Sequence, residues 1–108
     1  MSGRIVRITM FKIPEVEKQQ GLFEQYKILA KTQQKDGKPY ILSMNAGPAM
    51  DDPRSQGVTV VSKTEFTSLD DMKYYEEECA AHKELKKFNQ ANQIAKPMTV
   101  YFAPQVVA

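Results

Sequence analysis

His82 is the single histidine of the chain, so any proton transfer by an imidazole near neutral pH must use it. If a new helix begins near Ala81, His82 lies in its first turn, where the free N–H groups disfavour the imidazolium. A neutral imidazole can accept a proton from a carbon or hydroxyl acid. Tyr75, on the preceding helical turns, could donate a hydrogen bond to a developing enolate oxygen. The alternative is structural: His82 caps or packs a helix junction, and Tyr75 lies in the core.

Arg7 is the most unusual residue of the first predicted strand, because an unpaired cation is costly inside an apolar segment. Its guanidinium should meet a carboxylate, the solvent at the rim, or an anionic ligand. Arginine binds carboxylates through two parallel hydrogen bonds, so the functional interpretation is an acidic substrate. A structural ion pair is the alternative. Thr9, on the same strand face, and Tyr101, on the last strand, are predicted to line the same substrate site.

The other reactive residues indicate no further chemistry. Cys79 has no obvious activating base, and we expect a small buried hydrophobe. As the single cysteine it cannot form an internal disulfide, which fits a reducing compartment. Residues 51–53 favour a turn, since no second acidic cluster completes a metal site. With no Walker loop, dinucleotide fingerprint or zinc spacing, we predict neither metal nor cofactor.

Length and composition favour a single globular domain over residues 1–108, with an ordered core at about residues 4–104. The chain has 42% hydrophobic and 26% charged residues and a net charge of +2, values close to globular averages. No apolar run approaches the ~20 residues needed to cross a bilayer, and no secretory signal is recognisable. The mixed charges of residues 76–87 favour a solvated helix face. We therefore expect a cytoplasmic protein that binds neither membranes nor nucleic acid.

Periodicity predicts the order β-α-β-β-α-β, an α+β arrangement of the ferredoxin-like type. Strands are expected at 4–13, 40–46, 58–66 and 98–103, and helices at 15–34 and 69–94. Pro14 suits a first helical turn, residues 35–39 a helix stop, and Ser68 a helix N-cap. The apolar stripe of the second helix changes phase between Cys79 and Ala81. Two helical segments should therefore meet there.

The predicted sheet is covered by helices on one face only, which leaves the other face to be accounted for. We assign Ile5, Phe11 and Tyr101 to that open face. An apolar patch of this size calls for a partner. Sheet-to-sheet pairing of two copies about a two-fold axis meets the need, and gives a homodimer, a dimeric α/β barrel, with a small enclosed interior.

Three segments resemble the stress-responsive A/B barrel (Dabb) domain family. They are the first strand, RIVRITMFK at 4–12, the stretch from 57 to 72, and YYEEECAAH at 74–82. The resemblance implies a dimeric α+β barrel. The family includes a polyketide cyclase, and its catalytic tyrosine and histidine match Tyr75 and His82. Where the family often has a histidine in the first strand, this chain has Arg7.

Two functions are consistent with these observations, and a third, a cofactor-independent monooxygenase, rests on analogy at fold level alone. The first is a cofactor-free cyclase or isomerase acting on an enolisable polyketide-like or phenolic acid. His82 would be the base, and Tyr75 and Arg7 would orient the oxygens. The second is a non-catalytic dimeric protein that serves a stress response or binds a small ligand. The loop at 47–57 could cover a pocket, reach across the dimer or be mobile.

Overall fold

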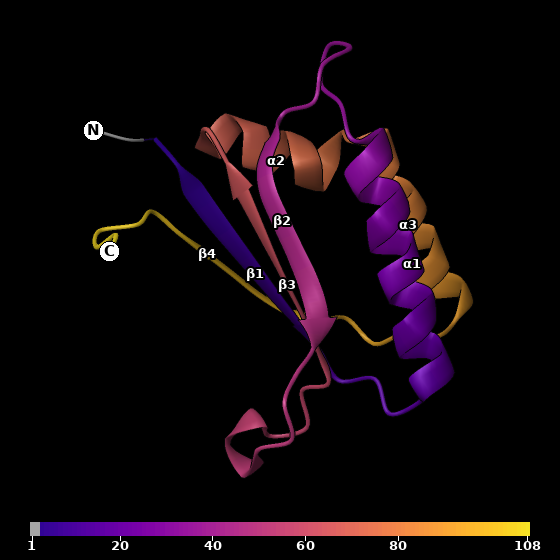
Figure 1. The fold of residues 1–108 in the computed structure, drawn as a ribbon. Coiled ribbons are helices and arrows are strands. Elements are labelled where there is room, and N and C mark those ends of the chain that lie inside the picture. The colour runs from indigo at the N-terminus through magenta and orange to yellow at the C-terminus, as the bar shows by residue number, and fades with distance from the viewer. Residues whose placement is uncertain (1–2) are drawn as a thin grey trace.

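Four strands pair into one antiparallel sheet in the computed structural model, which describes residues 3–108. The elements follow the chain as β1 (Ile5–Phe11), α1 (Val16–Thr32), β2 (Ile41–Pro48), β3 (Val60–Phe66), α2 (Leu69–Glu77), α3 (Ala80–Ala91) and β4 (Met98–Phe102). The strand order is β2-β3-β1-β4. Figure 1 shows α1 and α3 side by side along one face of the sheet, with α2 across its end. This is the ferredoxin-like α+β fold that the sequence predicts.

The predicted break in the second helical stretch is present between α2 and α3. Ser68 caps α2, as expected, because its Oγ accepts from the backbone N–H of Asp71 at 3.1 Å. Cys79 has an extended backbone and forms the N-cap of α3. The side chain of Cys79 is buried, in agreement with the predicted small hydrophobe.

The boundaries of α1 differ from the prediction at both ends. The helix begins after Pro14, which lies just outside its N-cap, Glu15. It ends at Thr32, well before Gly37. Gly37 instead forms a tight turn with Asp36, where both residues have positive φ and the flanking residues pair as a bridge. The predicted stop signal therefore reverses the chain after the helix has ended.

The prediction of which residues lie on the open face of the sheet was wrong. Ile5 and Phe11 point toward the helices and belong to the core, where they are 9% and 2% exposed. Tyr101 pairs with Arg7 across the β1–β4 ladder, so it lies on the same side as Arg7. A strand that is apolar on both faces does not reveal which face the helices will cover. The register instead gives the uncovered face six apolar residues, Val6, Ile8 and Met10 opposite Phe102, Val100 and Met98.

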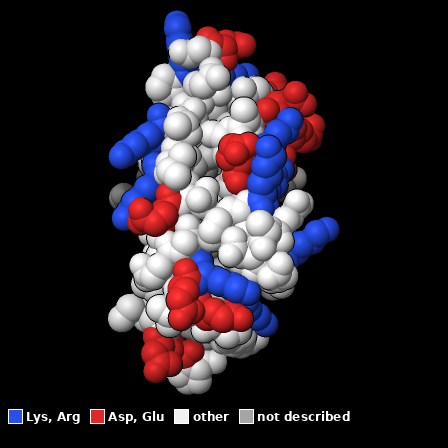
Figure 2. Space-filling model, turned by 90° about the vertical axis from the view of Figure 1, so that its right-hand side faces the viewer, with Lys and Arg blue, Asp and Glu red and all other residues white. Residues whose placement is uncertain are grey.

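The loop between β2 and β3 forms a turn, as residues 51–53 indicate. Its middle is a short 3-10 helix at Pro53–Ser55, and the Asp52 carboxylate accepts from the backbone N–H of Arg54 at 2.8 Å. Within residues 3–108 there is no group of His, Cys, Asp and Glu side chains suited to a metal ion. The same residues contain no helix long and apolar enough to span a membrane. Figure 2 shows acidic and basic side chains interleaved over the helical side, as the mixed-charge pattern predicts.

Candidate functional site

The helix-facing side of the sheet is apolar at both ends and polar in the middle. On β1, Arg7 and Thr9 lie between Ile5 and Phe11 on this side. The same order recurs on the neighbouring strand, where Ser62 and Thr64 lie between Val60 and Phe66. The ladder register places Arg7 opposite Thr64 and Thr9 opposite Ser62. The four polar side chains therefore form one patch, which we call the polar patch, in the centre of an apolar layer.

Arg7 is held in this patch by two neighbours. Its Nε donates to Glu76 Oε2 at 2.9 Å, and Nη1 donates to Thr9 Oγ1 at 3.0 Å. The guanidinium carbon also lies 5.2 Å from the centre of the Tyr75 ring, within range of a cation–π contact. The expectation that Arg7 meets a carboxylate is thus met by an internal partner from α2.

His82 lies in the first turn of α3, as predicted, and only 6% of it is exposed. Its Nδ1 is 2.8 Å from the carbonyl oxygen of Tyr75. A carbonyl oxygen only accepts, so Nδ1 carries the hydrogen and the lone pair of the neutral ring is on Nε2. Burial lowers the pKa of His82 to about 4, and the positive charges of Arg7 and Lys86 act in the same direction. The ring is neutral at pH 7.

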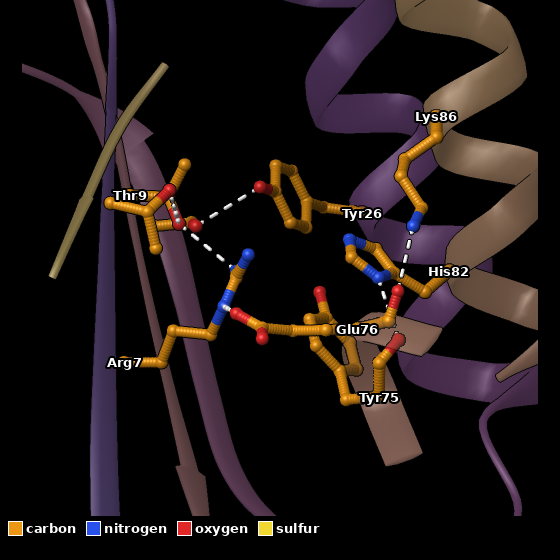
Figure 3. A network of polar contacts seen from close by, with 9 residues as sticks. Arg7, Thr9, Tyr26, Tyr75, Glu76, His82 and Lys86 are labelled. Atoms are coloured by element: carbon orange, nitrogen blue, oxygen red, sulfur yellow. Dashed lines mark hydrogen bonds and ion pairs between the residues drawn. The ribbon is translucent and has the colours of Figure 1, made fainter. Parts of the chain in front are cut away.

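Two tyrosines complete the group around His82. The Tyr75 ring stacks on the imidazole with centroids 3.8 Å apart, and the Tyr26 hydroxyl donates to Ser62 Oγ at 3.0 Å. Burial raises the pKa of both tyrosines, so their hydroxyls stay protonated. Figure 3 shows both rings, the imidazole and the Arg7 guanidinium pointing toward one another between the sheet and the helices. Elements far apart in sequence therefore bring hydroxyl, imidazole and guanidinium groups to one place.

The α2–α3 junction gives His82 a structural role as well. Two carbonyl groups at the end of α2 have lost their helical partners, and side chains of α3 satisfy both. His82 Nδ1 binds the carbonyl of Tyr75, and Lys86 Nζ donates to the carbonyl of Glu76 at 2.8 Å. His82 thus caps the junction through Nδ1, while Nε2 takes no part in the cap.

The remaining predicted site residues are placed differently from one another. Thr9 is buried beside Arg7, and its Oγ1 lies 3.4 Å from Thr99 Oγ1 of β4. Tyr101 lies beside Arg7 in the ladder but is 52% exposed, at the outer strand of the sheet. The structure therefore gathers Arg7, Thr9, Tyr75 and His82 into one cluster and leaves Tyr101 at its rim.

Sequence reasoning missed five residues of the cluster and its polar patch: Tyr26, Ser62, Thr64, Glu76 and Lys86. Tyr26 falls on the apolar stripe of its helix, where an aromatic residue indicates core. Glu76 and Lys86 belong to the charged segment that was assigned to solvent. Ser62 offers the one usable signal, since a small hydroxyl at the inward positions of an otherwise apolar strand marks a polar spot.

A separate hollow of about 340 Å³ lies beside the β2–β3 loop. Its lining includes Gln19 of α1, Asp51 and Thr59, and contains none of the predicted site residues. The loop at 47–57 therefore borders this hollow and takes no part in the cluster around His82.

Comparison with known proteins settles the family. Residues 5–97 match the model of the stress responsive A/B barrel domain. The chain belongs to this family. The match confirms the family that the three segments resemble. It spans both the polar patch and the α2–α3 junction.

The relatives of this A/B barrel chain include one biosynthetic protein and several solved structures. A fusaristatin A biosynthesis cluster protein of Gibberella zeae is 53% identical over 105 residues, which cover 97% of this chain and 76% of the relative. A dimeric ferredoxin-like protein of unknown function from Jannaschia sp. CCS1 superposes with a TM-score of 0.74 at 16% identity, covering 94% of this chain and 100% of that one. Hydroxynitrile lyase from Passiflora edulis gives 0.73 at 12% identity, with 100% of both chains covered. The two structures support the fold.

Proposed function

We propose that this chain is a cofactor-free acid–base enzyme of the cyclase or isomerase kind, acting on an enolisable polyketide-like or phenolic substrate. The observation that carries the proposal is the state of His82. Its tautomer is fixed by the Tyr75 carbonyl, and within residues 3–108 its Nε2 lone pair has no hydrogen-bond partner, beside two protonated tyrosines and an arginine. The biosynthetic cluster named for the Gibberella zeae relative supports a role in small-molecule synthesis.

In this proposal Nε2 of His82 takes a proton from a carbon next to a substrate carbonyl. The enolate oxygen that forms accepts hydrogen bonds from the Tyr75 hydroxyl and from an N–H of Arg7. A pKa of about 4 makes His82 by itself a weak base. The negative enolate would raise that pKa because it stabilises the imidazolium beside it. The imidazolium then returns the proton to another carbon or oxygen of the product, so the residue is regenerated.

We further propose that the chain works as one cytoplasmic domain within a homodimer that pairs through the uncovered face. On β4, Met98, Val100 and Phe102 are 65%, 47% and 50% exposed, and the ladder places them beside the apolar residues of β1. An apolar stripe of this length on the surface is typical of an interface. The Jannaschia protein, which has the same fold, is described as dimeric.

A non-catalytic, ligand-binding or stress-response role is the second candidate, and one observation favours it. The proposed active groups already have internal partners: Arg7 binds Glu76, and His82 binds the Tyr75 carbonyl. A network that satisfies itself needs no substrate to be stable.

His82→Asn separates the two candidates. The asparagine amide can still donate to the Tyr75 carbonyl, but it has no basic nitrogen in place of Nε2. Wild-type protein and the variant would be incubated with linear polyketide-like β-keto acids and phenolic ketones, and products followed by mass spectrometry. We expect a folded variant whose turnover is at least ~100-fold lower, the usual contribution of a general base.

Lys83→Asn, a change at an exposed position of the same helix, is the matched control and should retain full turnover. Equal turnover in wild type and His82→Asn would show that His82 is not the general base. Ligand binding without turnover in either protein would favour the second candidate.

A further inference from the structure

The Arg7–Glu76 ion pair joins the polar patch of the sheet to the end of α2. Glu76 belongs to the end of α2, and its side chain is 32% exposed, compared with 11% for Arg7. Figure 3 shows the carboxylate of Glu76 lying against the guanidinium, with Tyr75 next to both. Of the two partners, Glu76 is therefore the more accessible to a ligand in the solvent.

The charge balance of the cluster depends on this pair. Glu76 contributes the only carboxylate that contacts Arg7 in the described part of the chain. His82 is neutral at pH 7, and the Lys86 ammonium is bound at the carboxyl end of α2, where the helix dipole offsets part of its charge. The guanidinium that the sequence suggests as an anchor for an acidic substrate is therefore already neutralised.

A carboxylate and an uncharged carbonyl would fare differently at this site. A carboxylate must either displace Glu76 from Nε or lie close to a like charge, and like charges in contact are strongly unfavourable. A ketone or phenol oxygen carries no net charge and can accept from a guanidinium N–H that Glu76 and Thr9 leave unused. The same internal pair thus penalises one ligand class and admits the other.

We propose that Glu76 is a specificity-determining residue that makes this site take uncharged ketones and phenols in preference to carboxylates. The inference rests on the proposed function, since it concerns the same site. It narrows that function from polyketide-like or phenolic substrates in general to the uncharged ones among them. Glu76 acts here through Arg7, as a positioning residue that holds the guanidinium and cancels its charge.

A matched pair of small ligands tests this preference directly. Salicylate and ortho-hydroxyacetophenone have the same ring and phenol, and differ in a carboxylate oxygen replaced by a methyl group. We expect wild-type protein to bind the ketone about tenfold more tightly than salicylate, measured by NMR titration at pH 7. Preference for salicylate, or binding of neither ligand, would overturn the proposal without any variant being made.

Glu76→Gln should then abolish the selection, because the amide oxygen can still accept from Arg7 Nε but carries no charge. The ratio of the two dissociation constants should move toward salicylate by about tenfold. Glu77→Gln, one residue along α2 and exposed, removes the same net charge and should leave the ratio unchanged. Equal shifts in the two variants would show a long-range charge effect and would overturn the assignment to Glu76.

The two proposals fail independently in these experiments. The role of His82 as a base is judged by turnover in His82→Asn, whereas the selection by Glu76 is judged by binding ratios that require no turnover. Loss of selection with an intact His82 effect would leave an acid–base enzyme of broader specificity.

Discussion

Strand β1 presents Arg7 and Thr9 to the covered side of the sheet and Val6, Ile8 and Met10 to the uncovered side. In a lone protomer both choices cost free energy. Polar groups are buried on one side, while on the other Ile8 and Met10 stay partly exposed beside the exposed apolar residues of β4. The two unfavourable terms are reduced in different ways. Buried polar groups are satisfied by one another or by a ligand, whereas an exposed apolar stripe is typical of an interface. The contrast supports one site on the inside and one interface on the outside of the same strand.

The covered side itself divides in a similar way. Its apolar ends, with Phe11 and Val60 at one end and Ile5 and Phe66 at the other, lie in the continuous core. Its polar middle satisfies its own hydrogen bonds, and such bonds contribute little net stability. Stability therefore resides mainly at the ends of the sheet, and the chemistry that the fold can offer resides between them.

The outer face gives the largest expected effect. Val100→Asp places a charge in the centre of the apolar stripe on β4, and in a two-fold interface the charge would occur twice. We expect the dimer to weaken by at least ~1,000-fold, because burying an unpaired carboxylate costs several kcal/mol. Sedimentation velocity over a range of concentrations measures the change.

Ile28→Asp is the control for this substitution, since Ile28 is similarly exposed but lies on α1, away from the uncovered face. Its dimerisation should match that of the wild type. If Val100→Asp and wild type sediment identically, the apolar stripe is not the interface.

The polar interior predicts a dependence of stability on pH. The pKa of His82 is about 4 in the folded chain, against an ordinary value of 6.5. Between these values the unfolded chain binds a proton that the folded chain does not, so stability falls as the pH is lowered from about 7 to about 4. The loss should reach about 3 kcal/mol.

Urea unfolding of the wild type and His82→Asn at several pH values isolates this contribution. The lowered carboxyl pKa values of Asp52 and Glu65 destabilise both proteins equally in acid, so they cancel in the difference. Only the wild type should show the additional loss above pH 4. Parallel stability curves for the two proteins would mean that His82 is not held neutral by burial.

Local signals explain how much of the fold could be predicted from sequence. The Ser68 cap, the phase change near Cys79 and the strand alternation depend on neighbouring residues, so they predict the element order and the α2–α3 junction. The position of His82 in the first turn of α3 was predicted correctly for the same reason. Arg7 was recognised because a buried cation must find a partner, whatever that partner is.

Long-range geometry explains what the sequence could not give. Glu76 looks like its exposed neighbours Glu77 and Glu78, and only the packing of α2 over β1 brings it to Arg7. Tyr26 looks like a core aromatic until its hydroxyl is seen to reach Ser62, 36 residues away. The covered face of β1 was misassigned because both faces carry enough apolar residues to be buried.

The smallest effect tests whether the polar middle contributes to stability at all. Ser62→Ala leaves the Tyr26 hydroxyl, in a residue only 6% exposed, without its partner, and should cost about 1–2 kcal/mol. Adding Tyr26→Phe removes the orphaned group as well, and the double variant should return to within about 0.5 kcal/mol of the wild type. Val60→Ala, at the apolar end of the same strand, has no such rescue and should cost about 2 kcal/mol. Urea unfolding of the four proteins measures these differences. A double variant as unstable as Ser62→Ala would show that the hydrogen bond between Tyr26 and Ser62 itself stabilises the fold. Stability alone would then explain the pair, and it would no longer support a binding site.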